Sequence, residues 1–424
     1  KGLLSMFNLA SGSLDPSEPA HFGDGFLLER GFTLVWVGWQ FDVPDLKDRM
    51  RLFAPFVTRG VQAVTGPVRA EFITDKPVKE MPLGDRNHVP YAPVSLDDGT
   101  ATLTVRDRCD STRKAVARDA WKFSADGTHI LMEQGFVPSK IYEAVYTAKD
   151  PVVVGLGPAA IRDFISYLKY GSSVAGINQL GDQRRYIKRA IGFGTSQSGR
   201  FLRTFLHYGF NADEEGRMVF DGVWAHVAGG GRGSFNHRFA QASRDGHPHF
   251  NCAYPTDIFP FTDLTQSDAE TGLSGGILAK AAEQKVVPKV FYTNSSYEYW
   301  GRAAALIHSS LDGRQDEALA GTTRAYLFAG TQHGPGAGQA RSMPVCALRS
   351  GVYSVWRSGR WRSSKGPVMP GPLRLSRAGG SGRAGCARRA GGLAVGGQLH
   401  PATVGARVLG DAAGIHVAAG GHAV

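Results

Sequence analysis

The sequence predicts an α/β protein with a mostly parallel sheet, flanking helices and a β-rich insertion. Short apolar runs alternate with helix-length segments, which is typical of a parallel sheet because a crossover helix joins each strand to the next. From about Pro44 to Ala148 the pattern changes to short alternating segments separated by Gly, Pro and Asp, which indicates antiparallel strands. The 424 residues suffice for one large domain with such an insertion.

Residues 1–44 are predicted to form the first part of the core. The apolar run from Gly2 to Phe7 and the β-branched, aromatic run from Phe32 to Val37 are the expected strands. The segment from Gly25 to Gly31 between them is helix-like. The chain begins with Lys1 rather than Met, so we expect it to be a fragment whose N-terminus is missing.

Residues 45–148 are predicted to be the β-rich insertion, and residues 149–338 the second part of the core. In the insertion, alternating segments cover residues 68–73, 101–105 and 140–146. In the core, strands are expected at residues 152–154, 190–193, 222–227, 288–292 and 324–329, and helices at about residues 158–170 and 199–208.

Residues 339–424 form an anomalous tail that is rich in Gly, Ala, Arg and Ser. These 86 residues contain no Glu, Asn or Phe, and the change in composition is abrupt. Disorder is one explanation, since a segment of this composition cannot bury enough apolar surface to fold. A shifted reading frame is the other. We favour the shifted frame, because the break directly follows a well-patterned segment.

The net charge of +11 does not predict a nucleic-acid partner, because the charge is unevenly distributed. The tail holds 12 basic residues and one acid, Asp411, which leaves 36 of the 48 basic and 36 of the 37 acidic residues in the first 338 positions. That part of the chain is neutral, so we expect no binding to nucleic acid. No run approaches the roughly 18 consecutive apolar residues of a transmembrane helix, so no membrane span is expected.

A motif for nucleophilic catalysis lies between the expected strand at 190–193 and the expected helix at 199–208. The segment is Gly194-Thr-Ser-Gln-Ser-Gly199. A serine becomes a nucleophile when a base removes its proton and a sharp strand-to-helix turn lifts it clear of the backbone. In such a nucleophile elbow, the positions two before and two after the serine must be small so that strand and helix can approach closely.

Ser196 is the predicted nucleophile, and Ser198 is the alternative. With Ser196 the small positions are Gly194 and Ser198, whereas with Ser198 they are Ser196 and the bulky Arg200. A long side chain does not fit the crowded position, which favours Ser196. Ser198 nevertheless departs from the usual final glycine of the motif.

The base and the acid are expected in loops after late strands, in the chain order Ser, acid, His. His333 follows the expected strand at 324–329 and is the predicted base. Glu298 follows the preceding strand and is the predicted acid, because a carboxylate on the second imidazole nitrogen fixes the tautomer. Asp257 and Asp263, in another loop, remain open as alternatives to Glu298.

The oxyanion that forms on acyl attack needs two hydrogen-bond donors. The backbone N–H of Gln197, directly after the nucleophile, is the first predicted donor. Asn8, after the first strand, is the candidate for the second, and Trp39 and Gln40 are its rivals.

No cofactor and no metal site is predicted. The stretch from Gly155 to Ala160 matches a dinucleotide-binding pattern, but no acid ends a following strand at the required distance. His247 and His249 resemble a metal-binding pair that lacks a third ligand at a clear spacing. The four cysteines are far apart, so free thiols are expected rather than a zinc site or a disulfide framework.

Several segments resemble a bacterial family of alpha/beta hydrolase domain-containing proteins, over roughly residues 1–336. They are residues 191–202, 221–229, 254–261, 291–301 and 330–335. The Gly-x-Ser-x-x-Gly-Arg elbow is also similar to that of glucuronoyl esterases, which use a Ser-Glu-His set. The resemblance implies the α/β-hydrolase fold, further strands before residue 1 and a closing helix after His333.

Together these features predict a cofactor-independent serine hydrolase that cleaves a small-molecule carboxylic ester. Ser196 attacks, His333 carries the proton and Glu298 orients the imidazole. An acyltransferase or a peptidase would use the same residues. A non-catalytic binding protein on the same fold would keep the sheet and lose the geometry.

Overall fold

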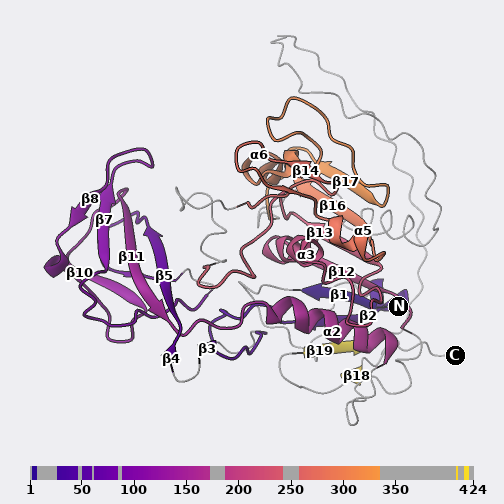
Figure 1. Cartoon of the computed structure of the whole chain (residues 1–424), viewed down its shortest axis with the longest axis horizontal. Coiled ribbons are helices and arrows are strands. Elements are labelled where there is room, and N and C mark those ends of the chain that lie inside the picture. Colours follow the sequence, from indigo (N-terminus) through magenta and orange to yellow (C-terminus); the bar gives the residue numbers. More distant parts are fainter. Residues whose placement is uncertain are drawn as a thin grey trace, which may run out of the picture. The chain divides into compact units, whose positions relative to one another are not determined.

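A computed structural model describes residues 2–6, 26–45, 50–59, 62–84, 88–171, 187–241, 257–334, 407–408 and 415–419 (Figure 1). The chain divides into two compact units, residues 1–333 with 404–424 and residues 334–403. Only Gly334 of the second unit is described, so all elements below belong to the first.

A sheet of eight strands forms the core, in the order β17-β16-β13-β12-β1-β2-β19-β18. The strands from β17 to β2 are parallel, and β19 and β18 continue the sheet with antiparallel pairing beside β2 (Figure 1). This mostly parallel sheet confirms the predicted α/β fold class. The bounds are β1 (Gly2–Met6), β2 (Thr33–Val37), β12 (Ala190–Thr195), β13 (Gly222–His226), β16 (Lys289–Ser295), β17 (Thr323–Phe328), β18 (Arg407–Val408) and β19 (Ile415–Ala419).

Helices α2 (Leu156–Tyr170) and α3 (Gln197–His207) pack on one face of this sheet. Ile165 of α2, Phe205 of α3 and Val223 of β13 belong to one buried hydrophobic cluster, which is the main core. The other elements of this part are short: α1 (Phe26–Glu29), β14 (Gln266–Ser267), β15 (Ser274–Gly275), α5 (Ala279–Glu283), α6 (Ser296–Gly301) and the 3-10 helix η4 (Ala304–Ile307).

The segment between β2 and α2 is rich in antiparallel strands that form their own sheets. One sheet has the order β5-β11-β7-β8, a second has β6-β10-β9, and β3 pairs with β4. The bounds are β3 (Thr58–Arg59), β4 (Gln62–Ala63), β5 (Thr65–Phe72), β6 (Val78–Pro82), β7 (Thr102–Arg106), β8 (Lys114–Val116), the 3-10 helix η2 (Arg118–Ala120), β9 (Trp121–Phe123), β10 (His129–Phe136) and β11 (Ile141–Lys149). These sheets enclose a second hydrophobic core.

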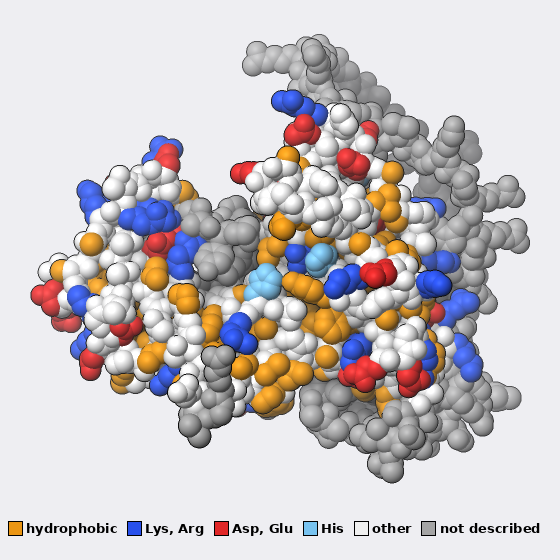
Figure 2. Space-filling view, viewed as in Figure 1, with side chains coloured by type: hydrophobic (Ala, Val, Ile, Leu, Met, Phe, Trp, Pro, Cys, Tyr) orange, Lys and Arg blue, Asp and Glu red, His pale blue; other side chains and the backbone are white. Residues whose placement is uncertain are grey.

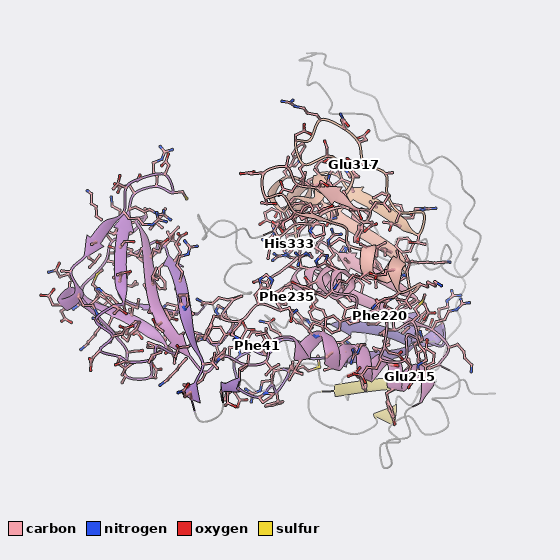
Figure 3. The ribbon with its side chains drawn as sticks, viewed as in Figure 1. Phe41, Glu215, Phe220, Phe235, Glu317 and His333 are labelled. Carbon is pink, nitrogen blue, oxygen red and sulfur yellow. The ribbon has the colours of Figure 1, made fainter. Side chains whose placement is uncertain are left out.

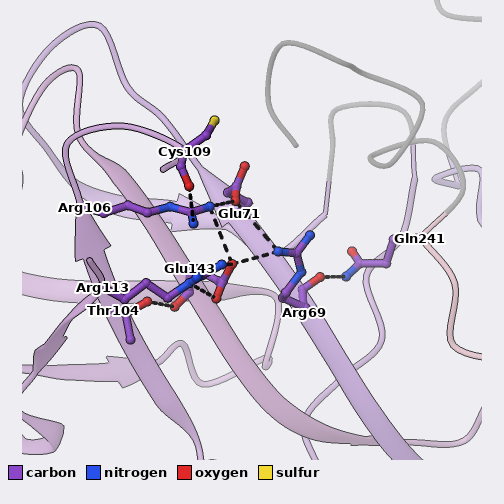
Figure 4. Close-up of polar contacts among 8 residues, drawn as sticks. All are labelled: Arg69, Glu71, Thr104, Arg106, Cys109, Arg113, Glu143 and Gln241. Carbon is purple, nitrogen blue, oxygen red and sulfur yellow. Dashed lines mark hydrogen bonds and ion pairs between the residues drawn. The ribbon is translucent and has the colours of Figure 1, made fainter. Parts of the chain in front are cut away.

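A cluster of buried charges joins strands β5, β7 and β11 (Figure 4). Arg106 donates to Glu71 and Arg69 donates to Glu143, each at 2.7 Å, and Arg113 adds two further bonds to Glu143. Burial alone would raise the pKa of Glu143, but hydrogen bonds and charge from the neighbouring arginines lower it overall. Because strand side chains alternate between faces, a slip by one residue would carry these charges into the hydrophobic core. The cluster therefore favours a single register of the three strands.

Two expectations about local structure are wrong. The apolar run from Val152 to Val154 is not a strand, since Val152 makes only an isolated antiparallel bridge with Phe56. A run of three apolar residues is too short to distinguish a strand from a connection. Cys109 is disulfide-bonded rather than a free thiol, and the other three cysteines lie outside the described residues. Spacing along the chain does not reveal such a bond, because it depends on proximity in space.

Strands β18 and β19 lie within the tail, residues 339–424. The pairing of β19 with β2 runs from Ile415 opposite Val37 to Ala419 opposite Thr33. It covers the edge of β2, which would otherwise present unpaired backbone groups. The origin of the tail and the predicted domain bounds stay predictions.

Candidate active site

The turn between β12 and α3 holds Ser196 in a strained conformation. Since β12 ends at Thr195 and α3 begins at Gln197, Ser196 is the single residue between strand and helix. Its φ of 56° and ψ of −118° lie outside the regions that residues other than glycine prefer. Such a conformation costs about 1–3 kcal/mol and persists where the surrounding structure enforces it. This sharp strand-to-helix turn is the local geometry that the predicted nucleophile elbow requires.

Two glycines allow the strand and the helix of this turn to touch. A Cβ atom on Gly194 would lie 2.5 Å from the backbone carbonyl of Ser198, and one on Gly199 would lie 2.9 Å from the backbone oxygen of Gly194 and 2.7 Å from Cβ of Ala228, after β13. The crowded helix position is therefore Gly199, which explains why a serine is tolerated at 198. Ser198 is fully buried and accepts a hydrogen bond from Trp39 Nε1 at 3.1 Å.

The loop after β17 brings His333 to Ser196. His333 Nε2 lies 2.8 Å from Ser196 Oγ. The start of this loop is tied to α6, because the backbone N–H of Gly330 donates to Ser296 Oγ at 2.7 Å. His333, labelled in Figure 3, keeps 45% of its side chain exposed, and Figure 2 shows histidine side chains at the surface among hydrophobic ones. Solvent therefore reaches the imidazole.

Glu298 completes a row of three side chains. It lies in the first turn of α6 with no exposed surface, and its Oε1 is 2.5 Å from His333 Nδ1. A hydrogen on Nδ1 that is shared with a carboxylate leaves the lone pair of Nε2 directed at Ser196. Burial alone would raise the pKa of Glu298, but hydrogen bonds from His333 and Ser295 lower it overall. The carboxyl group is therefore ionised at neutral pH.

The two alternative acids are engaged elsewhere. Asp263 is buried, and its Oδ1 accepts a hydrogen bond from the Tyr292 hydroxyl at 2.6 Å. Asp257 forms ion pairs with Arg302 at 3.4 Å and with Arg200 at 3.7 Å. Among the three candidates, the glutamate is the acid that the structure brings to the histidine.

Only part of the predicted oxyanion site lies within the described residues. Gln197 is the first residue of α3, so its backbone N–H directly follows Ser196, the predicted nucleophile. Asn8 lies outside the described residues. The side chains of both rivals have other partners. The ring N–H of Trp39 donates to Ser198 in α3, and the Gln40 amide donates to Asp42 at 2.5 Å. The donor pair stays a prediction.

Three residues that the sequence-based prediction missed also support the site. Ser295 caps α6 and bonds to Glu298. The carbonyl of His226 accepts a hydrogen bond from the backbone N–H of Ser196 at 2.8 Å, and the Tyr297 ring meets the His333 ring edge to face, with ring centroids 5.6 Å apart. Ser295 had a readable signal, because Ser-x-x-Glu before a helix is a capping box. The other two carry no signal of their own.

The patterns that suggested a cofactor or a metal have structural explanations or lie outside the described residues. A Cβ atom on Gly157 would lie 2.5 Å from the backbone oxygen of Trp39, so this glycine serves close packing of α2. Within the described ranges, no group of three or more His, Cys, Asp or Glu side chains is arranged to hold a metal ion. His247 and His249 are not described. None of the helices in the described part has the length and hydrophobicity needed to cross a bilayer.

Comparison with known proteins identifies a family. A family model described as an alpha/beta hydrolase domain matches residues 103–374, which is more than half of the chain. The match includes Ser196, Glu298 and His333, and it begins inside the β-rich segment rather than near residue 1. No curated protein and no solved structure matches the chain significantly. The similarity of the elbow to glucuronoyl esterases stays a prediction.

Proposed function

Because the chain belongs to the alpha/beta hydrolase domain family, which supports a hydrolase-type function, we propose that it is a serine hydrolase that cleaves carboxylic esters. The observation that carries the proposal is the continuous row from Ser196 Oγ through His333 to Glu298, with separations of 2.8 Å and 2.5 Å. The strained backbone of Ser196 adds support, since a non-catalytic binding protein has no need of it.

In the proposed first step, Ser196 Oγ attacks the acyl carbon of the ester while its proton moves to His333 Nε2. The carbonyl oxygen becomes an oxyanion, which the backbone N–H of Gln197 and a second donor, assigned to Asn8, would stabilise. His333 then gives its proton to the departing alkoxide as the ester bond breaks. The product of this step is an acyl group on Ser196.

In the second step, water loses a proton to His333 and attacks the acyl carbon. The tetrahedral intermediate collapses, the carboxylic acid leaves, and the proton returns to Ser196 Oγ. Glu298 remains ionised throughout and stabilises the imidazolium that forms in each step. The proposed reaction uses no cofactor.

An acyltransferase or a peptidase would use the same three side chains. The exposure of His333 favours hydrolysis over acyl transfer, because water reaches the base beside the acyl group. Hydrolysis of an ester is also less demanding than hydrolysis of a peptide bond, since an alkoxide is a better leaving group than an amide nitrogen. Parallel assays with a p-nitrophenyl ester, the matched anilide and added alcohol acceptors separate the three activities.

The proposal predicts different effects for the two serines of the elbow. Ser196→Ala and His333→Ala should each abolish turnover of a short p-nitrophenyl ester, whereas Ser198→Ala should keep most of it. Ser198→Ala removes the buried hydrogen bond that Trp39 donates and leaves this donor without its acceptor, so its expected cost is about 1–3 kcal/mol of stability. An inactive Ser198→Ala beside an active Ser196→Ala would overturn the assignment.

A further inference from the structure

The two oxygens of the buried Glu298 carboxylate have different partners. Oε1 accepts the hydrogen bond from His333 Nδ1 at 2.5 Å. Oε2 accepts one from the backbone N–H of Ser295 at 2.9 Å and another from the Ser295 hydroxyl. Glu298 has no exposed surface, so these protein donors take the place of water. The carboxylate is therefore held between Ser295 on one side and His333 on the other.

The Ser295 hydroxyl is itself fixed by the helix that it caps. Its oxygen accepts the backbone N–H of Tyr297 at 3.1 Å, and its single hydrogen is directed at Glu298 Oε2. Ser295 is the last residue of β16 and is almost fully buried, so the sheet fixes its backbone. A capping box ordinarily satisfies the free N–H groups of a helix end. In this chain the glutamate of the box also bonds to the candidate catalytic histidine.

From this geometry we infer that Ser295 is a positioning residue, which aims the Glu298 carboxylate at the imidazole of His333. The inference rests on the proposed function. By holding Oε2, Ser295 leaves Oε1 for Nδ1, and its donors stabilise the charged form of a carboxyl group whose pKa burial alone would raise. Without the hydroxyl, the carboxylate keeps only the backbone donor on Oε2 and can rotate away from the imidazole.

The first test is Ser295→Ala, assayed with a short p-nitrophenyl ester. Loss of one hydrogen bond to a buried carboxylate is expected to lower kcat about tenfold. KM should stay unchanged, because Ser295 is not expected to touch the substrate. Ser295→Thr keeps a hydroxyl and a good helix cap, so it should restore most of the rate.

Ser310→Ala is the matched control. The Ser310 hydroxyl also donates to a carboxylate, Asp312 at 2.5 Å, and accepts the backbone N–H of Arg314 at 3.2 Å, but this turn is exposed. Its loss should leave kcat at the wild-type value. A Ser295→Ala protein with a lower melting temperature and a wild-type kcat would show that Ser295 is only a helix cap, which overturns the inference.

A double-mutant cycle decides whether Ser295 acts through Glu298. In the Glu298→Gln background, Ser295→Ala should have no further effect on kcat, since the group through which it acts has already been replaced. Independent effects of the two substitutions would overturn the inference.

Labelling of the wild-type protein by a fluorophosphonate probe separates this inference from the proposed function. A wild-type protein that is not labelled would overturn both. A labelled wild-type protein whose Ser295→Ala variant reacts at the same rate would overturn the inference alone, and a slower variant supports it.

Discussion

Replacing Glu298 by glutamine tests how the candidate histidine is oriented, with little change in side-chain volume. The carboxylate accepts hydrogen bonds on both oxygens, from His333 and from Ser295, whereas an amide has one accepting oxygen and one donating nitrogen. If the nitrogen faces His333 Nδ1, the imidazole hydrogen must move to Nε2, which then cannot accept the proton of Ser196. If the nitrogen faces Ser295, two donors oppose each other in a buried site.

The expected loss in kcat/KM for Glu298→Gln is about 10³-fold or more, which corresponds to about 4 kcal/mol of transition-state stabilisation. The charge-assisted bond of 2.5 Å to His333 accounts for about 1.5–3 kcal/mol of this value. The wrong imidazole tautomer accounts for the remainder. The free energy of unfolding should change little by comparison, because the capping bond can be kept by the amide oxygen.

Initial rates on a p-nitrophenyl ester, measured beside thermal melting, compare this variant with Asp257→Asn and Asp263→Asn. The aspartate variants should lose stability, because each leaves buried partners behind, and should keep kcat at temperatures well below melting. A 10³-fold loss in either aspartate variant, together with an active Glu298→Gln, would refute the assignment of the acid.

Two further predictions concern stability. Gly194→Ala places a Cβ atom 2.5 Å from the backbone carbonyl of Ser198, so it should lower the free energy of unfolding by about 3 kcal/mol and reduce activity. In Gly321→Ala, the control, the new Cβ has no atom within 4 Å, so stability and activity should stay unchanged. Denaturant titrations and rate assays measure the two effects. Burial raises the pKa of Asp42 to about 7, with the hydrogen bond from Gln40 opposing the shift. Between about pH 4 and 7 the unfolded chain releases this proton and the folded chain keeps it, so stability should fall as pH rises, by up to about 4 kcal/mol. Asp42→Asn should remove this part of the pH dependence, and identical pH profiles for the two proteins would contradict the prediction.

The core strands and helices could be predicted closely because their signals are local. The bounds of β12 and α3 differ from the expected ones by about two residues at their shared turn, because the ends of strands and helices are less sharply defined than their centres. The pairing of Arg106 with Glu71 could not be predicted, since it depends on the register of two strands that are distant in the chain. The pairing of β19 with β2 could not be predicted for the same reason.

The three side chains of the candidate site were accessible to sequence reasoning because each follows a strand whose C-terminal end lies at one edge of a parallel sheet. Ser196, Glu298 and His333 meet there, although their catalytic roles stay predictions. The role of the His226 carbonyl was not accessible, because a backbone acceptor leaves no trace in the residue type. The bond of Cys109 is another contact that only proximity in space reveals.

The central claim is that Ser196 is a nucleophile activated by His333, and covalent labelling tests it most directly. The full chain is incubated with a fluorophosphonate probe, digested and analysed by mass spectrometry, beside the His333→Ala variant. We predict a stoichiometric adduct on Ser196 in the wild-type protein and a loss of labelling in the variant. An adduct on Ser198, equal labelling of both proteins, or no adduct on the wild-type chain would contradict the claim.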